Sequence, residues 1–327
     1  MSWRSWTASS FLAVTCLLVA LAIGLFVRHF SQPGPLSQPR TVIISQGQTL
    51  PKISKLLTQH GVLTNSMLFS WHVRLRGAAQ KLQAGEYQFA SHITPEQILN
   101  ALILGKTVKH NFTVPEGMTT FQILDKLNQQ ELLSGECSIP IAEGEILPET
   151  YSFYLGETRN KLLERMRQAM TETLQKLWIN RDPGLPLQSA QDALILASIV
   201  EKEAKLAQER PRIAAVFLNR LKKDMQLQAD PTVIYGLNLE RNQPTQQLTK
   251  KDLTHASPYN TYMRADLPPT PICNPGYASI HAVLHPSKTD ELYFVADGTG
   301  GHVFSKTYQA HKQHHQNWRK VRRSLDL

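Results

Sequence analysis

The chain has 327 residues, of which 42% are hydrophobic and 19% charged, and its formal net charge at neutral pH is +9. This length predicts two domains with a sizeable core, and the composition is that of an ordinary globular protein. The positive charge favours a partner with anionic groups, such as nucleic acid, a lipid surface or a carboxylate-bearing polymer. There is no zinc-finger spacing, Gly-rich phosphate loop or arginine-rich arm, so we expect no nucleic-acid binding.

An apolar segment at residues 11–27 carries no charge and follows Arg4. It lies at the short limit for spanning a bilayer and is longer than a usual signal-peptide core. We therefore predict an uncleaved transmembrane anchor over residues 1–30, with cleavage near residues 20–22 as the alternative. Residues 31–40 are rich in Pro, Ser and Gln, and we expect them to form a linker.

Residues 44–63 and 114–133 repeat one another. Each segment has a β-branched residue, then a glycine and a threonine, and then apolar residues at helical spacing. This pattern predicts a strand, a glycine turn and a helix that begins at the threonine.

A third helix is predicted from the cap at Thr94 and Pro95 to a stop at Gly105, with a strand at residues 82–87. Small strand–helix units of this kind resemble the LysM carbohydrate-binding module, which we place at residues 41–110. The alternative is a packing scaffold that binds no ligand.

The next strong helix signal begins at Ser189, which forms a capping-box pattern with Asp192. We expect this helix to continue to a break at Arg210, where a second helix follows. Two glutamates stand among its aliphatic residues, where a carboxylate is costly unless it is paired or used. Its bulky apolar stripe consists of Ile195, Leu196, Ile199, Val200 and Leu206.

Glu203 falls near the middle of this stripe, whereas Glu201 points to another face with Lys205 at i+4 as an ion-pair partner. Glu203 should therefore be the more desolvated and have a raised pKa, which a general acid needs near neutral pH. A structural role is the alternative, because a glutamate in such a place is more often paired with an arginine. Arg210 and Arg220 are both close in sequence, as is Arg212.

An ordered series of short motifs surrounds this helix, and no single one is specific. In order, they are EGEILPETY at 143–151, the E-K-E at 201–203, NRL at 219–221, QADPT at 228–232, SPYNTY at 257–262, LPPTPI at 267–272, NPG at 274–276 and a hairpin at 294–304. The series resembles the MltG/YceG-like endolytic murein transglycosylases and covers nearly the whole chain after the anchor.

The resemblance implies a single-pass protein of the bacterial inner membrane with its catalytic domain in the periplasm. Such an enzyme cleaves the β-1,4 bond between MurNAc and GlcNAc in nascent peptidoglycan strands without water and leaves 1,6-anhydroMurNAc ends. This would terminate glycan elongation, with cell-wall synthases as partners. The expected fold is α+β, with a mainly helical catalytic domain at residues 111–327 that carries a C-terminal hairpin.

The family's catalytic glutamate aligns with Glu203, and Glu201 is the fallback. One carboxyl group suffices for this reaction, because the substrate's own 6-hydroxyl replaces the water of a glycosidase. The oxocarbenium-like transition state and the acetamido group need polar support, although caps and turns would also explain the polar residues nearby. Our candidates for substrate binding are Asn219, Gln228, Asp230, Tyr235, Asn260 and Tyr262.

Two other functions compete with this one. A membrane-tethered peptidoglycan-binding scaffold would need no catalysis, and the E-K-E would then be a structural ion pair. A hydrolase of the same polymer would need a second acid, for which Asp230 and Glu116 are the nearest candidates.

Three histidines, His311, His314 and His315, have a spacing that metal ligands can use. No acidic or cysteine cluster completes a shell, so we expect a solvated basic helix near lipid headgroups, with no metal and no cofactor. Cys137 and Cys273 could pair or stay free.

Overall fold

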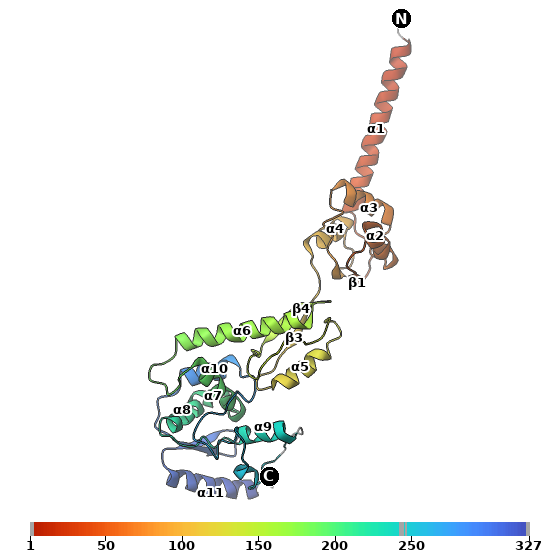
Figure 1. Cartoon of the computed structure of the whole chain (residues 1–327). Coiled ribbons are helices and arrows are strands. Elements are labelled where there is room, and N and C mark those ends of the chain that lie inside the picture. Colours follow the sequence, from red (N-terminus) through yellow and green to blue (C-terminus); the bar gives the residue numbers. More distant parts are fainter. Residues whose placement is uncertain (1–2, 242–244, 246, 325–327) are drawn as a thin grey trace. The chain divides into compact units, whose positions relative to one another are not determined.

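The computed structural model describes residues 3–241, 245 and 247–324 (Figure 1). It has the expected α+β architecture, and the strands of this described part form three two-stranded sheets. The chain divides into two compact units. The first is Met1–His110 with Phe153–Gly156, and the second is Asn111–Ser152 with Glu157–Leu327.

The first unit surrounds a two-stranded antiparallel sheet in which Val42 lies opposite Tyr87. Val42 and Ile44 alternate with exposed residues along the first strand, so that one face of the sheet is buried. The elements are α1 (Trp3–Ser31), β1 (Arg40–Ile44), α2 (Leu50–Gln59), α3 (Ser66–Leu75), β2 (Gly85–Phe89) and α4 (Pro95–Leu104).

Helix α1 is long and apolar enough to cross a membrane over Phe11–Ser31, a test that a signal sequence near the N-terminus also passes. Its last turn belongs to the core of the first unit, since Phe30 is buried and stacks on the His72 ring, with 3.9 Å between the ring centroids. Residues 31–40 are held against the unit as well, because Leu36 is buried. The side chain of Arg4 lies outside the described part.

The predicted strand–glycine–helix repeat is confirmed. β1 leads through Gly47 to α2, and β3 (Lys109–Thr113) leads through Gly117 to α5 (Thr120–Asn128). Both glycines have φ of 76°, a left-handed conformation that explains why glycine stands there. The cap predicted at Thr94 is also confirmed as a complete capping box, whereas the strand expected at residues 82–87 begins only at Gly85.

The second unit is built around α7 (Ala190–Glu203), whose residues 193–200 are all buried. This helix contacts α6, α8, α9 and α10. Residues 193–200 are apolar except for Ser198, as expected for a helix segment that is buried on all sides. Strand β4 (Thr150–Tyr154) pairs with β3. The remaining elements are α6 (Arg159–Ile179), α8 (Arg210–Leu221), α9 (Asp230–Arg241), α10 (Tyr277–Leu284), β5 (Tyr293–Ala296), β6 (His302–Ser305), α11 (Tyr308–Ser324) and two short 3-10 turns, Ala207–Glu209 and Asp252–Thr254.

The predicted C-terminal hairpin is confirmed. β5 and β6 pair antiparallel with Phe294 opposite Phe304, and the Asp297 carboxylate accepts the backbone N–H groups of Thr299 and Gly301 in the turn. Helix α11 packs on both strands. The side chains of Lys320, Arg322 and Arg323, part of the predicted basic helix, lie outside the described part.

The two cysteines outside the anchor are both free thiols in this structure. Cys273 is fully buried and lies 3.4 Å from the carbonyl oxygen of Ser198, whereas Cys137 is half-buried. The two thiols therefore form no disulfide with each other.

Candidate active site

The site begins at the C-terminal end of α7. Its N-terminus forms the predicted capping box between Ser189 and Asp192, but the helix ends at Glu203 and not at Arg210. Ala204 has an extended backbone, with φ of −79° and ψ of 99°. No glycine or proline stands near this end, so tertiary packing rather than a local breaker ends the helix. The prediction of a continuous helix to Arg210 was wrong for this reason.

Glu201 is locked in an ion pair. Its side chain is 5% exposed, and one oxygen lies 3.3 Å from the Arg210 guanidinium, while the other accepts the backbone N–H of Gly276 at 3.0 Å. Arg210 also reaches Glu116 at 3.1 Å, and a Cβ on residue 276 would collide with that glutamate. The expected pairing with Lys205 was wrong, because the helix ends before it and i+4 geometry is lost. Glu201 thus has the arginine partner that a structural role would require.

Glu203 has a different environment. It is half-buried, and no residue in the described part of the chain forms a hydrogen bond or ion pair with its carboxyl group. Burial raises its pKa to about 7, with a further upward contribution from the charge of Asp230 and a smaller opposing one from Arg220. Near neutral pH this group can therefore hold a proton and also accept one, which agrees with the expectation from its helical face.

Glu203 opens into a cleft of about 420 Å3. Three structural elements beside α7 form its walls: the end of α8 with the turn after it, the loop that ends at Tyr262, and the C-terminal hairpin with α11. The lining residues are Glu203, Arg220, Leu227, Gln228, Asp230, Tyr262, Phe294, Val295, Ala296, His302, His311 and His315.

Asp230 and Tyr262 form a short hydrogen bond in this cleft. The Tyr262 hydroxyl donates to Asp230 Oδ1 at 2.6 Å, and burial together with this carboxylate raises the pKa of the phenol. The turn before Asp230 is held to the same loop, because Gln228, at a φ of 51°, donates its backbone N–H to the carbonyl of Thr261 at 3.1 Å. The turn before Asp230 and the loop that carries Tyr262 therefore form one polar surface.

Arg220 connects two walls of the cleft. Its side chain donates to the carbonyl oxygens of Leu292, at 2.7 Å, and Leu227, at 2.8 Å. Burial lowers its pKa, but an arginine stays charged in proteins. This cation favours the ionised form of Glu203. Arg220 thus both fixes the cleft and limits how far the pKa of Glu203 rises.

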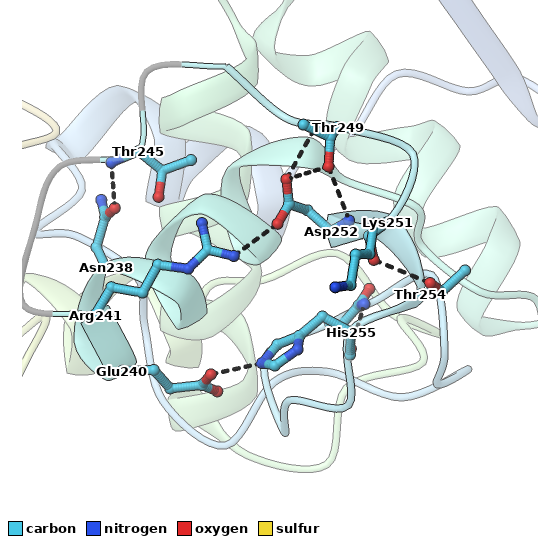
Figure 2. A network of polar contacts seen from close by, with 10 residues as sticks. Asn238, Glu240, Arg241, Thr245, Thr249, Lys251, Asp252, Thr254 and His255 are labelled. Atoms are coloured by element: carbon cyan, nitrogen blue, oxygen red, sulfur yellow. Dashed lines mark hydrogen bonds and ion pairs between the residues drawn. The ribbon is translucent and has the colours of Figure 1, made fainter.

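A polar network at the end of α9 supports the loop that carries Tyr262 (Figure 2). Arg241 lies 2.7 Å from Asp252, and Asp252 also accepts hydrogen bonds from Thr249, which together hold its pKa below the ordinary value. The buried Asn260 continues the network by donating to the carbonyl oxygens of Leu253 and His255. These contacts therefore fix the part of the loop that precedes Tyr262.

Comparison with known proteins identifies the family. The model of the YceG-like family matches residues 42–317, which is most of the chain. The chain belongs to the YceG-like family. It is 30% identical to an endolytic murein transglycosylase of Bacillus subtilis strain 168, over 88% of each chain. An enzyme of the same name from Streptococcus pneumoniae R6 is 29% identical, over 81% of this chain but only 55% of the relative.

A solved structure has the same fold. The crystal structure of a YceG-like protein from Listeria monocytogenes matches 84% of this chain and 98% of its own, with a TM-score of 0.51 and 32% sequence identity.

Three of the six residues predicted to bind substrate in this YceG-like chain line the cleft, namely Gln228, Asp230 and Tyr262. The other three lie outside its lining and have structural partners. Asn219 donates to the carbonyl oxygens of Thr289 and Glu291, Tyr235 donates to Glu143 at 3.2 Å, and Asn260 supports the loop.

Four polar residues that line the cleft, Arg220, His302, His311 and His315, were not among the residues predicted to bind substrate. The expectation of a purely solvated C-terminal helix was wrong for His311, which is half-buried and stacks on Tyr293 with centroids 5.2 Å apart. Burial is the main cause that lowers its pKa. Within residues 3–241, 245 and 247–324, no group of three His, Cys, Asp or Glu side chains could hold a metal ion.

Proposed function

We propose that this protein is an endolytic murein transglycosylase that cleaves the β-1,4 bond between MurNAc and GlcNAc inside peptidoglycan strands and leaves 1,6-anhydroMurNAc ends. The names of its relatives support the substrate class. The assignment rests on the environment of Glu203. Its carboxyl group is unpaired and half-buried, lies in the cleft, and has a pKa raised to about 7.

In the proposed reaction, Glu203 first donates its proton to the glycosidic oxygen as the bond from that oxygen to the MurNAc C1 breaks. The 6-hydroxyl of the same sugar then forms a bond to C1 and returns its proton to the Glu203 carboxylate. No water is consumed, and the carboxyl group ends as it began. Gln228, Asp230 and Tyr262 line the same cleft, and in this proposal they support the positive charge and the acetamido group.

A hydrolase is the second candidate, because Asp230 lines the same cleft as Glu203 and glycoside hydrolysis uses two carboxyl groups. Against it, Asp230 already accepts the Tyr262 hydroxyl at 2.6 Å. Glu116, the other candidate acid, is paired with Arg210. The chemical form of the product ends decides between the two reactions.

We further propose that α1 anchors the enzyme in the bacterial inner membrane, with the catalytic unit in the periplasm. In that compartment it would terminate glycan elongation beside the cell-wall synthases. The apolar span of α1 supports the anchor. We also propose a LysM-like role for the first unit, which would hold the glycan strand during cleavage. This role rests on its small strand–helix units, β1 with α2 and β2 with α4.

The decisive experiment is digestion of purified glycan strands by the full chain in detergent micelles, with mass analysis of the product ends. We expect anhydro ends from the wild type and from Glu201→Gln, the matched carboxyl-to-amide control, and no cleavage by Glu203→Gln. Reducing ends would make the protein a hydrolase. Cleavage that survives Glu203→Gln would remove Glu203 from the reaction, and a folded wild type that binds strands without cleaving them would support the scaffold.

A further inference from the structure

Helix α3 carries an apolar face that no part of the described chain covers. Met67, Trp71 and Leu75 stand at i, i+4 and i+8, so they share one side of the helix. Their exposed fractions are 68%, 58% and 75%. The opposite side holds Phe69 and Val73, which are fully buried in the core.

Helix α3 is thus apolar on two opposite sides. An exposed cluster of large apolar residues marks an interaction site. The membrane that α1 would cross is a suitable partner, because α3 lies beside the end of the apolar span of α1 (Figure 1).

Ring contacts fix the height of α3 along that span. His72, the residue after Trp71, stacks on Phe30 with centroids 3.9 Å apart, and its ring also lies 6.0 Å from that of Phe26. Both phenylalanines belong to the span Phe11–Ser31. Five residues of helix rise by about 7.5 Å, so α3 lies level with the last turn and a half of the span, where hydrocarbon gives way to headgroups.

We propose that the α3 face formed by Met67, Trp71 and Leu75 inserts into the headgroup–acyl boundary of the membrane that α1 spans. The inference rests on the proposed anchoring of α1. Tryptophan is enriched at this depth because its ring is amphipathic. The exposed Arg74, in the last turn of α3, can meet lipid phosphates. Two contacts, the span and this face, then hold the first unit at a fixed height and tilt on the bilayer.

The test uses the full chain in nanodiscs of phosphatidylethanolamine and phosphatidylglycerol, with a doxyl quencher either near the headgroup or at the acyl-chain end. The chain has five tryptophans, so the emission of Trp71 is the difference between wild type and Trp71→Phe. We expect this emission to be lost for the most part with the shallow quencher and less with the deep one. Equal emission in labelled and unlabelled discs would overturn the proposal.

A matched pair of variants sharpens the test. Met67→Gln with Leu75→Gln should reduce the quenching of Trp71. Ile43→Gln, at a 53% exposed residue of β1 in the same unit, should leave it unchanged. If a second copy of the chain covers α3 instead, the emission will be blue-shifted but unquenched, and this would also overturn the proposal.

Failure of the membrane insertion and failure of the enzymatic function give different results. Flotation of the full chain with liposomes tests the anchoring of α1 directly, and a chain that does not float overturns both the anchor and the α3 proposal. Murein cleavage in micelles is measured separately, and we expect the Met67→Gln and Leu75→Gln chain to retain it. If the wild type does not cleave murein, the quenching and flotation measurements still test the insertion of α3 into the membrane.

Discussion

The two glutamates in the last turn of α7 have opposite environments. On the ion-pair side, Glu201 is 5% exposed and is held by Arg210 and the backbone N–H of Gly276. On the cleft side, Glu203 has no such partner, and its pKa rises to about 7. One turn of helix thus holds one glutamate in an ion pair and leaves the other without a hydrogen-bonded cation. For Glu203, burial in that setting raises the pKa.

The largest expected effect is on catalysis. Glu203→Gln should lower kcat by about 10²–10⁴-fold, the usual contribution of a general acid–base group, whereas Glu201→Gln should retain most of the activity. Initial rates on purified glycan strands measure both. A loss of the same size in Glu201→Gln, in a chain with native circular dichroism, would contradict the division between the two sides.

The next effect is on stability. Arg210→Ala leaves the buried carboxylate of Glu201 without its cation, and breaking a buried pair in this way costs about 3–5 kcal/mol. Arg210 is itself 14% exposed, so the lower end of that range applies. Urea unfolding in micelles measures the loss. The double variant Glu201→Gln, Arg210→Met should recover part of it, and a double variant as unstable as Arg210→Ala would refute the pairing.

On the cleft side, by contrast, removing a charged group should increase the stability of the chain. Folded Glu203 has a pKa of about 7 against an ordinary value of 4.5, so between these pH values the folded state binds more protons than the unfolded state and stability falls as pH rises. Above pH 7, Glu203→Gln should therefore stabilise the chain by up to about 3 kcal/mol, and near pH 4.5 it should not. Unfolding free energies at the two pH values provide the measurement. A gain that is independent of pH would contradict the ionisation of Glu203 as its cause.

A smaller effect concerns the neighbour of Glu203. Asp230→Asn removes the negative charge that helps to raise the pKa of Glu203, so the protonated acid is lost at lower pH. The alkaline limb of the kcat–pH profile, which should fall through about pH 7 in the wild type, should move toward acid. A limb that stays in place would show that Asp230 does not act on Glu203 through its charge.

The smallest expected change is at Lys205. It was the predicted partner of Glu201, but the helix ends before it, so Lys205→Ala should change the unfolding free energy by less than about 0.5 kcal/mol. The same urea titration tests this. A clear loss would mean that the two residues interact after all.

Local chemistry made part of this structure predictable. The capping boxes at Ser189 and Thr94, and the glycine turn at Gly117, depend on residues within a few positions of each other. Each was found from the sequence alone. The same holds for Glu203, because its place among aliphatic residues already predicted desolvation, and for the hairpin at the C-terminus.

Contacts between distant segments were not predictable in this way. The end of α7 at Glu203 follows no local breaker. His311 enters the cleft only because α11 folds back on the hairpin, which nothing in its own sequence shows. Helix α3 was not among the predicted helices, and its exposed apolar side with Trp71, opposite the buried side with Phe69, is visible only in the structure.

The point where α7 ends has one more consequence. The peptide dipoles of a helix add up to about half a negative charge at its C-terminus, a place that normally suits lysine or arginine. Glu203 is the last residue of the helix, so its ionised form faces this negative pole in addition to the desolvation. The backbone of α7 thereby helps to keep a proton on the group, and an added helical turn that moved the pole away would make Glu203 a stronger acid.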